Sequence, residues 1–215
     1  MGQKINPYSF RLATTKEWKS RWIAKDKTEY KENLLEDIKI RRYLIDKLKM
    51  AGLVETQIDR SINKIRIALK VSRPGVVIGR GGSGLEILKK DLCALVSMSD
   101  AETNLELDVE EVKDPEISAR LVASKVAGQL EQRMPHRRVV SKAIERVMVS
   151  GAKGVKIALS GRVAGSEIGR TEVYKQGAIP LQTIRADVDY AQVPSLTRMG
   201  YVGVKVWIYK GELNL

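Results

Sequence analysis

Residue types that build catalytic and metal sites are scarce in this sequence. It contains one cysteine, Cys93, and one histidine, His136, among 215 residues. A single cysteine excludes an intrachain disulfide and suits a reducing compartment, and a single histidine excludes zinc sites built on histidine pairs. Because Cys93 lies among leucines, we interpret it as a small buried hydrophobic residue rather than a nucleophile.

Long apolar segments and nucleotide-hydrolysing motifs are also missing. No apolar run approaches the length of a membrane span, and the first residues, MGQKINPYSF, lack the apolar core of a signal peptide. We therefore expect a cytoplasmic protein with no membrane partner. The phosphate-loop pattern G-x-x-x-x-G-K-[ST] is absent.

One pair of carboxylates remains to be considered for chemistry. Asp187 and Asp189 could hold Mg²⁺ or act as acid and base, but Arg185 lies on the same face and an ion pair is the simpler interpretation. We therefore expect no enzyme activity, no catalytic residues, no bound metal or cofactor, and no small-molecule substrate.

The chain has a large surplus of positive charge. Lys and Arg total 38 against 26 for Asp and Glu, which gives a formal net charge of +12 and a pI near 9.7. Such a surplus favours a polyanionic partner, most often nucleic acid. Because 43% of the residues are hydrophobic, the chain can also build buried cores.

A glycine-rich basic turn stands at the centre of the segment Arg73–Lys90, which reads RPGVVIGRGGSGLEILKK. The turn consists of Gly79, Arg80, Gly81 and Gly82, and a helical pattern of leucines follows it. Glycines let a backbone approach a phosphate closely, and the N–H groups that begin a helix carry partial positive charge. We therefore predict that this turn binds a sugar–phosphate backbone.

Two motifs are compatible with the turn. Gly79, Gly81 and Gly84 match G-x-G-x-x-G, the dinucleotide-binding pattern of an enzyme, although Pro74 leaves only a short strand before it. The turn also matches G-x-x-G, the loop with which KH domains clamp nucleotides. We favour the KH interpretation because helix, strand, strand, glycine loop, helix and strand are predicted in this order.

The hydrophobic pattern predicts an α/β protein of α+β type with two domains behind a basic arm. We assign residues 1–28 to the arm, residues 29–113 to a KH domain with a three-stranded sheet, and residues 114–215 to an α/β domain. The latter is expected to pack two helices on an antiparallel or mixed four-stranded sheet.

Individual elements follow from periodicity. Helices are predicted over residues 29–51, from the glycine loop to about Ser97, and over 116–134 and 137–150; strands are predicted over 53–59, 63–71, 104–112, 155–160, 171–176, 183–192 and 201–209. The first helix is expected to bury one face that carries Leu34, Ile38, Ile45 and Leu48.

Positive charge gathers in the arm and on the last predicted helix. The arm interleaves its cations with Trp18 and Trp22, which suits RNA binding, although packing on a core is the simpler interpretation for the tryptophans. In the helix, Arg138, Lys142 and Arg146 form an i, i+4, i+8 row that can follow a nucleic-acid backbone. The arm cations that we assign to RNA are Lys4, Arg11, Lys16, Lys19 and Arg21.

Several segments resemble the bacterial S-three family of small-subunit ribosomal proteins. They are GQKINP, RPGVVIGRGG, GAKGVKIALSGR, PLQTIRADVDYA and GYVGVKVWIYKGE. The resemblance implies a type II KH domain followed by an α/β domain. It also implies binding to small-subunit rRNA in the head near the mRNA entrance, with neighbouring ribosomal proteins of the head as partners.

The resemblance further implies a role for the last predicted helix. In that family, a basic row at the start of this helix faces incoming mRNA and helps the ribosome to unwind it. Arg137 and Arg138 match the row, Ser141 stands at its third position, and Lys142 is adjacent. The alternative function is that of a free-standing KH-type regulator of mRNA.

Overall fold

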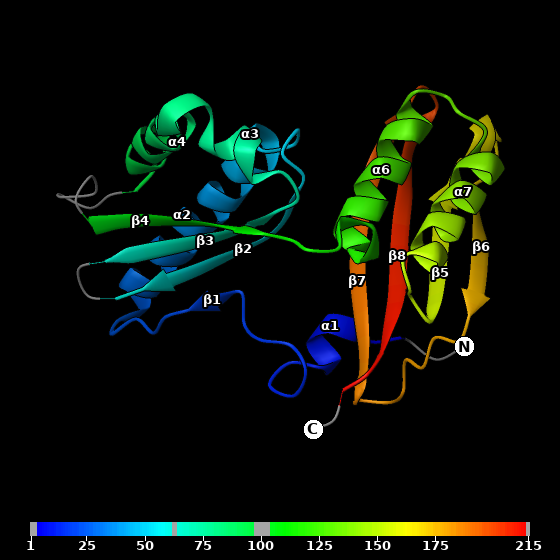
Figure 1. Cartoon of the computed structure of the whole chain (residues 1–215), viewed down its shortest axis with the longest axis horizontal. Helices are drawn as coiled ribbons and strands as arrows, with labels where there is room; N and C mark the ends of the chain where they lie inside the picture. Colours follow the sequence, from blue (N-terminus) through cyan, green and yellow to red (C-terminus); the bar gives the residue numbers. More distant parts are fainter. Residues whose placement is uncertain (1–3, 62–63, 97–103, 214–215) are drawn as a thin grey trace. The chain divides into compact units, whose positions relative to one another are not determined.

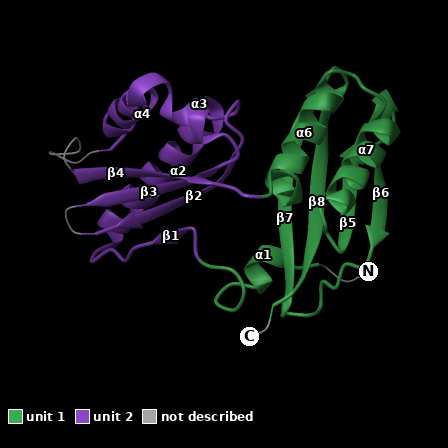
Figure 2. Cartoon of the chain, in the orientation of Figure 1, with its two compact units in different colours: residues 1–17, 114–215 green, residues 18–113 purple. Residues whose placement is uncertain are grey.

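The chain forms two compact units, each with its own hydrophobic core. The computed structural model describes residues 4–61, 64–96 and 104–213 (Figure 1). Unit 1 contains residues 1–17 and 114–215, and unit 2 contains residues 18–113 (Figure 2). The predicted start of the second strand and the predicted end of the glycine-loop helix at Ser97 fall on residues outside the described ranges.

Unit 2 is built on a four-stranded sheet in the order β1-β2-β3-β4. Strands β2 and β3 are antiparallel, whereas β1 pairs with β2 and β3 pairs with β4 in parallel. The sheet therefore contains the three predicted strands and a fourth, β1, which is two residues long and comes from the arm. The elements are β1 (Ser20–Arg21), α2 (Lys27–Lys47), β2 (Leu53–Arg60), β3 (Ile65–Val71), α3 (Pro74–Ile78), the 3₁₀ turn η1 (Arg80–Gly82), α4 (Ser83–Cys93) and β4 (Leu105–Glu111).

Helix α2 buries a different face from the one that its sequence predicts. Leu34, Ile38 and Ile45 are 38–43% exposed, whereas Ile40 and Leu44 are fully buried. The prediction is therefore wrong for three of its four residues, and only Leu48 is buried as expected. Apolar residues three and four apart occur on two faces of this helix, so periodicity alone does not select between them.

Unit 1 packs helices on a four-stranded sheet with the order β6-β5-β8-β7, in which every neighbouring pair is antiparallel. Helices α6 and α7 lie on one face of this sheet (Figure 1), which confirms the predicted architecture. The elements are α1 (Pro7–Phe10), η2 (Pro115–Ile117), α6 (Ala119–Glu131), α7 (His136–Val149), β5 (Gly154–Gly161), η3 (Val163–Gly165), β6 (Arg170–Gly177), β7 (Ala186–Thr197) and β8 (Gly200–Glu212).

Arg11 attaches the first residues of the chain to unit 1. Its Nε donates to the carbonyl oxygen of Ala186 at 2.7 Å, and a terminal nitrogen donates to that of Thr183 at 2.9 Å. The guanidinium also donates to the carbonyls of Pro7, Pro180 and Leu181. The strand that we predicted from residue 183 begins at residue 186, and the segment before it supplies three of these carbonyls, those of Pro180, Leu181 and Thr183.

The buried position of Arg11 excludes the role that we predicted for it. Its side chain has no exposed surface, and burial lowers its pKa from the ordinary value, with the charge of Asp187 opposing that effect. A side chain enclosed in this way has no access to a nucleic acid. The assignment of Arg11 to an RNA-binding arm is therefore wrong, and the residue stabilises the fold.

Candidate nucleic-acid interface

The glycine turn between α3 and α4 adopts a left-handed backbone at three residues. The φ angle is +70° at Gly79, +62° at Gly81 and +85° at Gly82. A Cβ atom built on Gly81 or Gly82 would meet no heavy atom within 4 Å. The backbone conformation therefore requires glycine at these two positions, and the outer side of the turn is open to a ligand.

Gly84 has a different physical role. A Cβ atom on Gly84 would lie 2.5 Å from the carbonyl oxygen of Val77 and 3.0 Å from that of Ile78. Helix α4 can therefore approach α3 this closely only with glycine here. The segment before the turn is helix α3, and the dinucleotide pattern requires a strand at this place. The structure thus contradicts the dinucleotide-binding alternative.

Charge and apolar side chains surround the open turn. Arg80 is exposed, and it adds a full positive charge to the N–H groups that begin the 11-residue helix α4. Val76 and Ile87 are 57% and 54% exposed, although the sequence analysis assigned neither to a ligand contact. Backbone amides beside exposed apolar side chains can hold phosphates and bases of one strand.

Helix α7 presents its predicted cations to solvent. Val139, Val140, Ile144 and Val147 are buried, and the cations on the other side are exposed: Arg137, Arg138, Lys142 and Arg146. Arg138, Lys142 and Arg146 form no ion pair with a carboxylate of the described residues. They recur every four residues, so successive cations are about 6 Å apart along the helix axis.

The carboxylate of Glu172 lies at the start of α7, where it contacts Tyr174 and His136. The Tyr174 hydroxyl donates to Glu172 at 2.7 Å, and Nε2 of His136 lies 3.0 Å from the same oxygen. The hydrogen bond from Tyr174 is the main cause that lowers the pKa of Glu172 from its ordinary value, and Arg170 and His136 add to it. Arg137 also acts on Tyr174 electrostatically, so the first cation of the helix has a partner within the chain.

The other arm cations differ in their surroundings. Lys4 and Arg21 are exposed, whereas Nζ of Lys16 lies 2.7 Å from Oδ1 of Asp187. The ion pair that we expected for Asp187 therefore exists, but its partner is Lys16 rather than Arg185. Asp189, the second carboxylate of that pair, accepts the backbone N–H of Ala119 at 2.8 Å.

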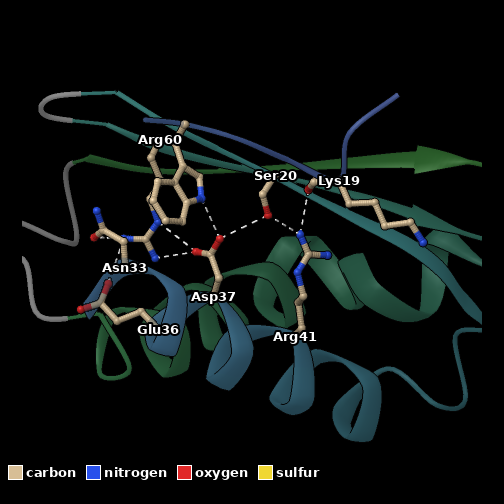
Figure 3. A network of polar contacts seen from close by, with 8 residues as sticks. Lys19, Ser20, Asn33, Glu36, Asp37, Arg41 and Arg60 are labelled. Atoms are coloured by element: carbon tan, nitrogen blue, oxygen red, sulfur yellow. Dashed lines mark hydrogen bonds and ion pairs between the residues drawn. The ribbon is translucent and has the colours of Figure 1, made fainter. Parts of the chain in front are cut away.

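A buried carboxylate organises the polar contacts between the arm and α2 (Figure 3). Asp37 is 3% exposed and accepts from Trp22 Nε1 at 2.9 Å and from Arg60 at 2.9 and 2.7 Å. The remaining nitrogen of Arg60 donates to Asn33 and Glu36. Trp22 is therefore part of the unit 2 fold, in agreement with the interpretation that the tryptophans pack on a core.

Arg41 makes a second set of contacts with the arm (Figure 3). It donates to the carbonyl oxygen of Lys19 at 2.7 Å and to the hydroxyl of Ser20 at 2.8 Å. The Lys19 side chain itself is 48% exposed and lies 3.9 Å from Glu55. Trp18 is 61% exposed, so the two tryptophans differ although both were expected to pack on a core.

The described ranges hold neither a metal-binding cluster nor a membrane-spanning helix. Within these, no group of three or more His, Cys, Asp and Glu residues is placed to hold a metal ion. No helix there has the length and apolar character needed to span a bilayer.

The helix–glycine turn–helix of unit 2, packed on its sheet, defines the class of this molecule as a KH-domain protein. The family model of the KH domain matches residues 39–117, and that of "Ribosomal protein S3, C-terminal domain" matches residues 126–208. The small ribosomal subunit protein uS3 of Caldanaerobacter subterraneus subsp. tengcongensis is 48% identical, and that of Caldicellulosiruptor saccharolyticus is 47% identical; each alignment covers 99% of this chain and 94% of the relative. The chain belongs to the uS3 family of small ribosomal subunit proteins, which is not a family of enzymes.

Proposed function

We propose that this chain is a structural constituent of the small ribosomal subunit in the cytoplasm, where it binds rRNA of the head and lines the mRNA entrance. Family membership supports the ribosomal part of this proposal. The turn Gly79–Gly82 offers open backbone amides and the charge of Arg80 to phosphates, and Lys4, Lys19 and Arg21 add exposed cations. Neighbouring ribosomal proteins of the head are its protein partners.

One observation carries the mRNA part of the proposal. The row Arg138, Lys142 and Arg146 lies exposed on α7, opposite the buried valines, without carboxylate partners among the described residues. Cations about 6 Å apart along one line can pair with successive phosphates of a single strand. Contacts to phosphates position a strand, so the row would hold the incoming mRNA strand in place while its hairpins are opened.

Glutamine at all three positions of the row tests this function. Each phosphate contact with a single strand contributes about −0.7 to the slope of log affinity against log salt. The slope of the isolated full chain should therefore become less steep by about 2 when three contacts are lost. Small subunits that carry the variant should assemble, yet translate messages with stable hairpins more slowly. Unchanged speed on hairpin messages would contradict the proposal.

A matched control removes the same charge elsewhere in unit 1. Lys153, Lys175 and Lys210 are exposed, and their replacement by glutamine should leave translation through hairpins at the original speed. An equal slowing by both triple variants would attribute the effect to net charge rather than to the row.

Sedimentation distinguishes the ribosomal function from the alternative of a free-standing KH regulator. A ribosomal constituent should sediment with small subunits at all stages of growth. A regulator would sediment mostly as free protein or with mRNA, away from the subunits.

A further inference from the structure

A cavity of about 390 Å³ lies in unit 1 at the turn between α6 and α7. Its apolar wall includes Leu130, Met134, Leu159 and Met199, and His136, the first residue of α7, also lines it. The volume falls within the range of pockets that bind small organic groups. The cations Arg138, Lys142 and Arg146 of the row on α7 do not line this cavity.

Three arginines line the same cavity. Arg133 and Arg198 are exposed, and Arg162 is half-buried with its Nε donating to the carbonyl oxygen of Ser166 at 2.8 Å. None of them forms an ion pair with a carboxylate in the part of the chain that the structure describes. An apolar interior with unneutralised cations around it suits a ligand that joins an apolar body to negative charge.

Two residues with a left-handed backbone also line this cavity. Among the described residues, Ala13, Arg133 and Ala164 are the non-glycine residues with positive φ. Two of them line the cavity, Arg133 with φ +61° and Ala164 with φ +57°. Arg133 takes its conformation directly after the end of α6, where the N–H of Met134 donates to the carbonyl oxygen of Gln129, as left-handed residues commonly do at helix ends. Ala164 lies within the 3₁₀ turn η3, so these angles fix the shape of the wall and the cavity and its arginines carry the inference.

We infer that this cavity binds one unstacked base of single-stranded RNA, with the flanking phosphates on Arg133 and Arg198. A base has flat apolar faces and is attached to charged phosphates, which matches the wall and its arginines. An apolar protein side chain would fill the interior but leave the arginines without counter-charge. The inference rests on the proposed RNA-binding role of α7, because the cavity lies where that helix begins.

Two methionines report on occupancy of the cavity. Met134 and Met199 are 43% and 47% exposed, so both should be oxidised by a mild peroxide treatment of the free chain. An unstructured oligoribonucleotide should protect both methionines, as measured by mass spectrometry of the full chain. The same oligonucleotide with abasic sites should bind roughly tenfold more weakly, the loss expected for one base contact, and give no protection.

Arg133→Gly separates binding from folding. Glycine removes the cation and accepts the left-handed φ without strain, so the variant should be at least as stable as the original chain. Combined with Arg198→Gln, it should abolish protection of the methionines while RNA still binds through the α7 row. Lys175→Gln, a charge change at an exposed residue outside the cavity wall, should preserve the protection.

The outcomes separate this inference from the proposed function. RNA binding without protection of the methionines, or equal protection by the abasic RNA, would overturn the base-binding cavity and leave the proposed function intact. Protection only in assembled subunits, and not with single-stranded RNA alone, would overturn a cavity that binds an unstacked base by itself. Absence of RNA binding by the full chain would overturn both.

Discussion

Asp37 is the buried residue that connects α2 to the arm through Trp22 and to β2 through Arg60. Its carboxylate accepts hydrogen bonds from Trp22 and Arg60, and both charged side chains of the Asp37–Arg60 pair are at most 9% exposed. Removing one partner of a buried pair leaves the other charge without compensation. The stability of unit 2 therefore depends on this pair more than on any exposed ion pair.

We predict that Asp37→Ala lowers the free energy of unfolding of unit 2 by ~3–5 kcal/mol, measured by urea denaturation. Asp108→Ala is the matched control, because Asp108 pairs with Arg66 at the surface, with side chains 43% and 59% exposed. An exposed pair contributes about 1 kcal/mol or less. Equal losses in the two variants would show that burial of Asp37 does not matter.

Arg11 shows the limit of reading function from the charge of a residue. It occurs in a basic segment, as Lys4 and Arg21 do, yet it is buried and bonded to carbonyls up to 175 residues away. Nothing in the local sequence distinguishes it from its exposed neighbours. Its role follows from the packing of α1 against the segment before β7.

At the scale of elements, the glycine turn depends on the close approach of α3 and α4. Gly81 and Gly82 are required by their left-handed φ angles, whereas Gly84 is required by the backbone of the opposite helix. The sequence predicted the turn correctly because glycine spacing is a local signal. It did not reveal the separate purpose of Gly84, because that purpose depends on a contact between helices.

We predict that Gly84→Ala destabilises unit 2 by ~1–3 kcal/mol, since the added methyl group meets a carbonyl oxygen at 2.5 Å. Gly75→Ala is the control. Gly75 lies in α3 with nothing within 4 Å of an added Cβ, and the change should stabilise by ~0.4–1 kcal/mol. Thermal unfolding of both variants measures the difference, and a neutral Gly84→Ala variant would contradict this account of the turn.

Helix α2 shows why an amphipathic helix can be predicted while its buried face is not. Leu34, Ile38 and Ile45 satisfy helical periodicity as well as Ile40 and Leu44 do. The structure buries the face that carries Ile40, Leu44 and Leu48, and Asp37 on the same side meets Arg60 of β2 and Trp22 of the arm. A carboxylate can be covered on this face because donors far away in the chain compensate it, and the spacing of apolar residues in the helix does not reveal those donors.

At the scale of the whole molecule, each unit has its own core and the arm is shared between them. Residues 1–17 belong to unit 1 and residues 18–28 to unit 2. The boundary of the KH domain that we proposed at residue 29 would leave out β1, Trp22 and the contacts of Lys19 with Arg41.

We predict that residues 18–113 fold alone, with a cooperative unfolding transition. A shorter piece, residues 29–113, should be less stable by at least ~1–3 kcal/mol, because Asp37 and Arg41 lose hydrogen-bond partners. Circular dichroism during urea denaturation compares the two pieces. Equal stability would show that the arm residues contribute nothing to unit 2.

The sequence by itself determined the order of most helices and strands, the glycine turn and the row on α7. These features depend on residues that are two, three or four positions apart. Such spacings are the same whatever the tertiary arrangement of the chain. Only the tertiary structure decided that Arg11 is buried, that Lys16 pairs with Asp187, which face of α2 is covered and where the cavity lies. Each of these depends on residues far apart in the chain, whose proximity is fixed by packing and by the need of buried charges for partners.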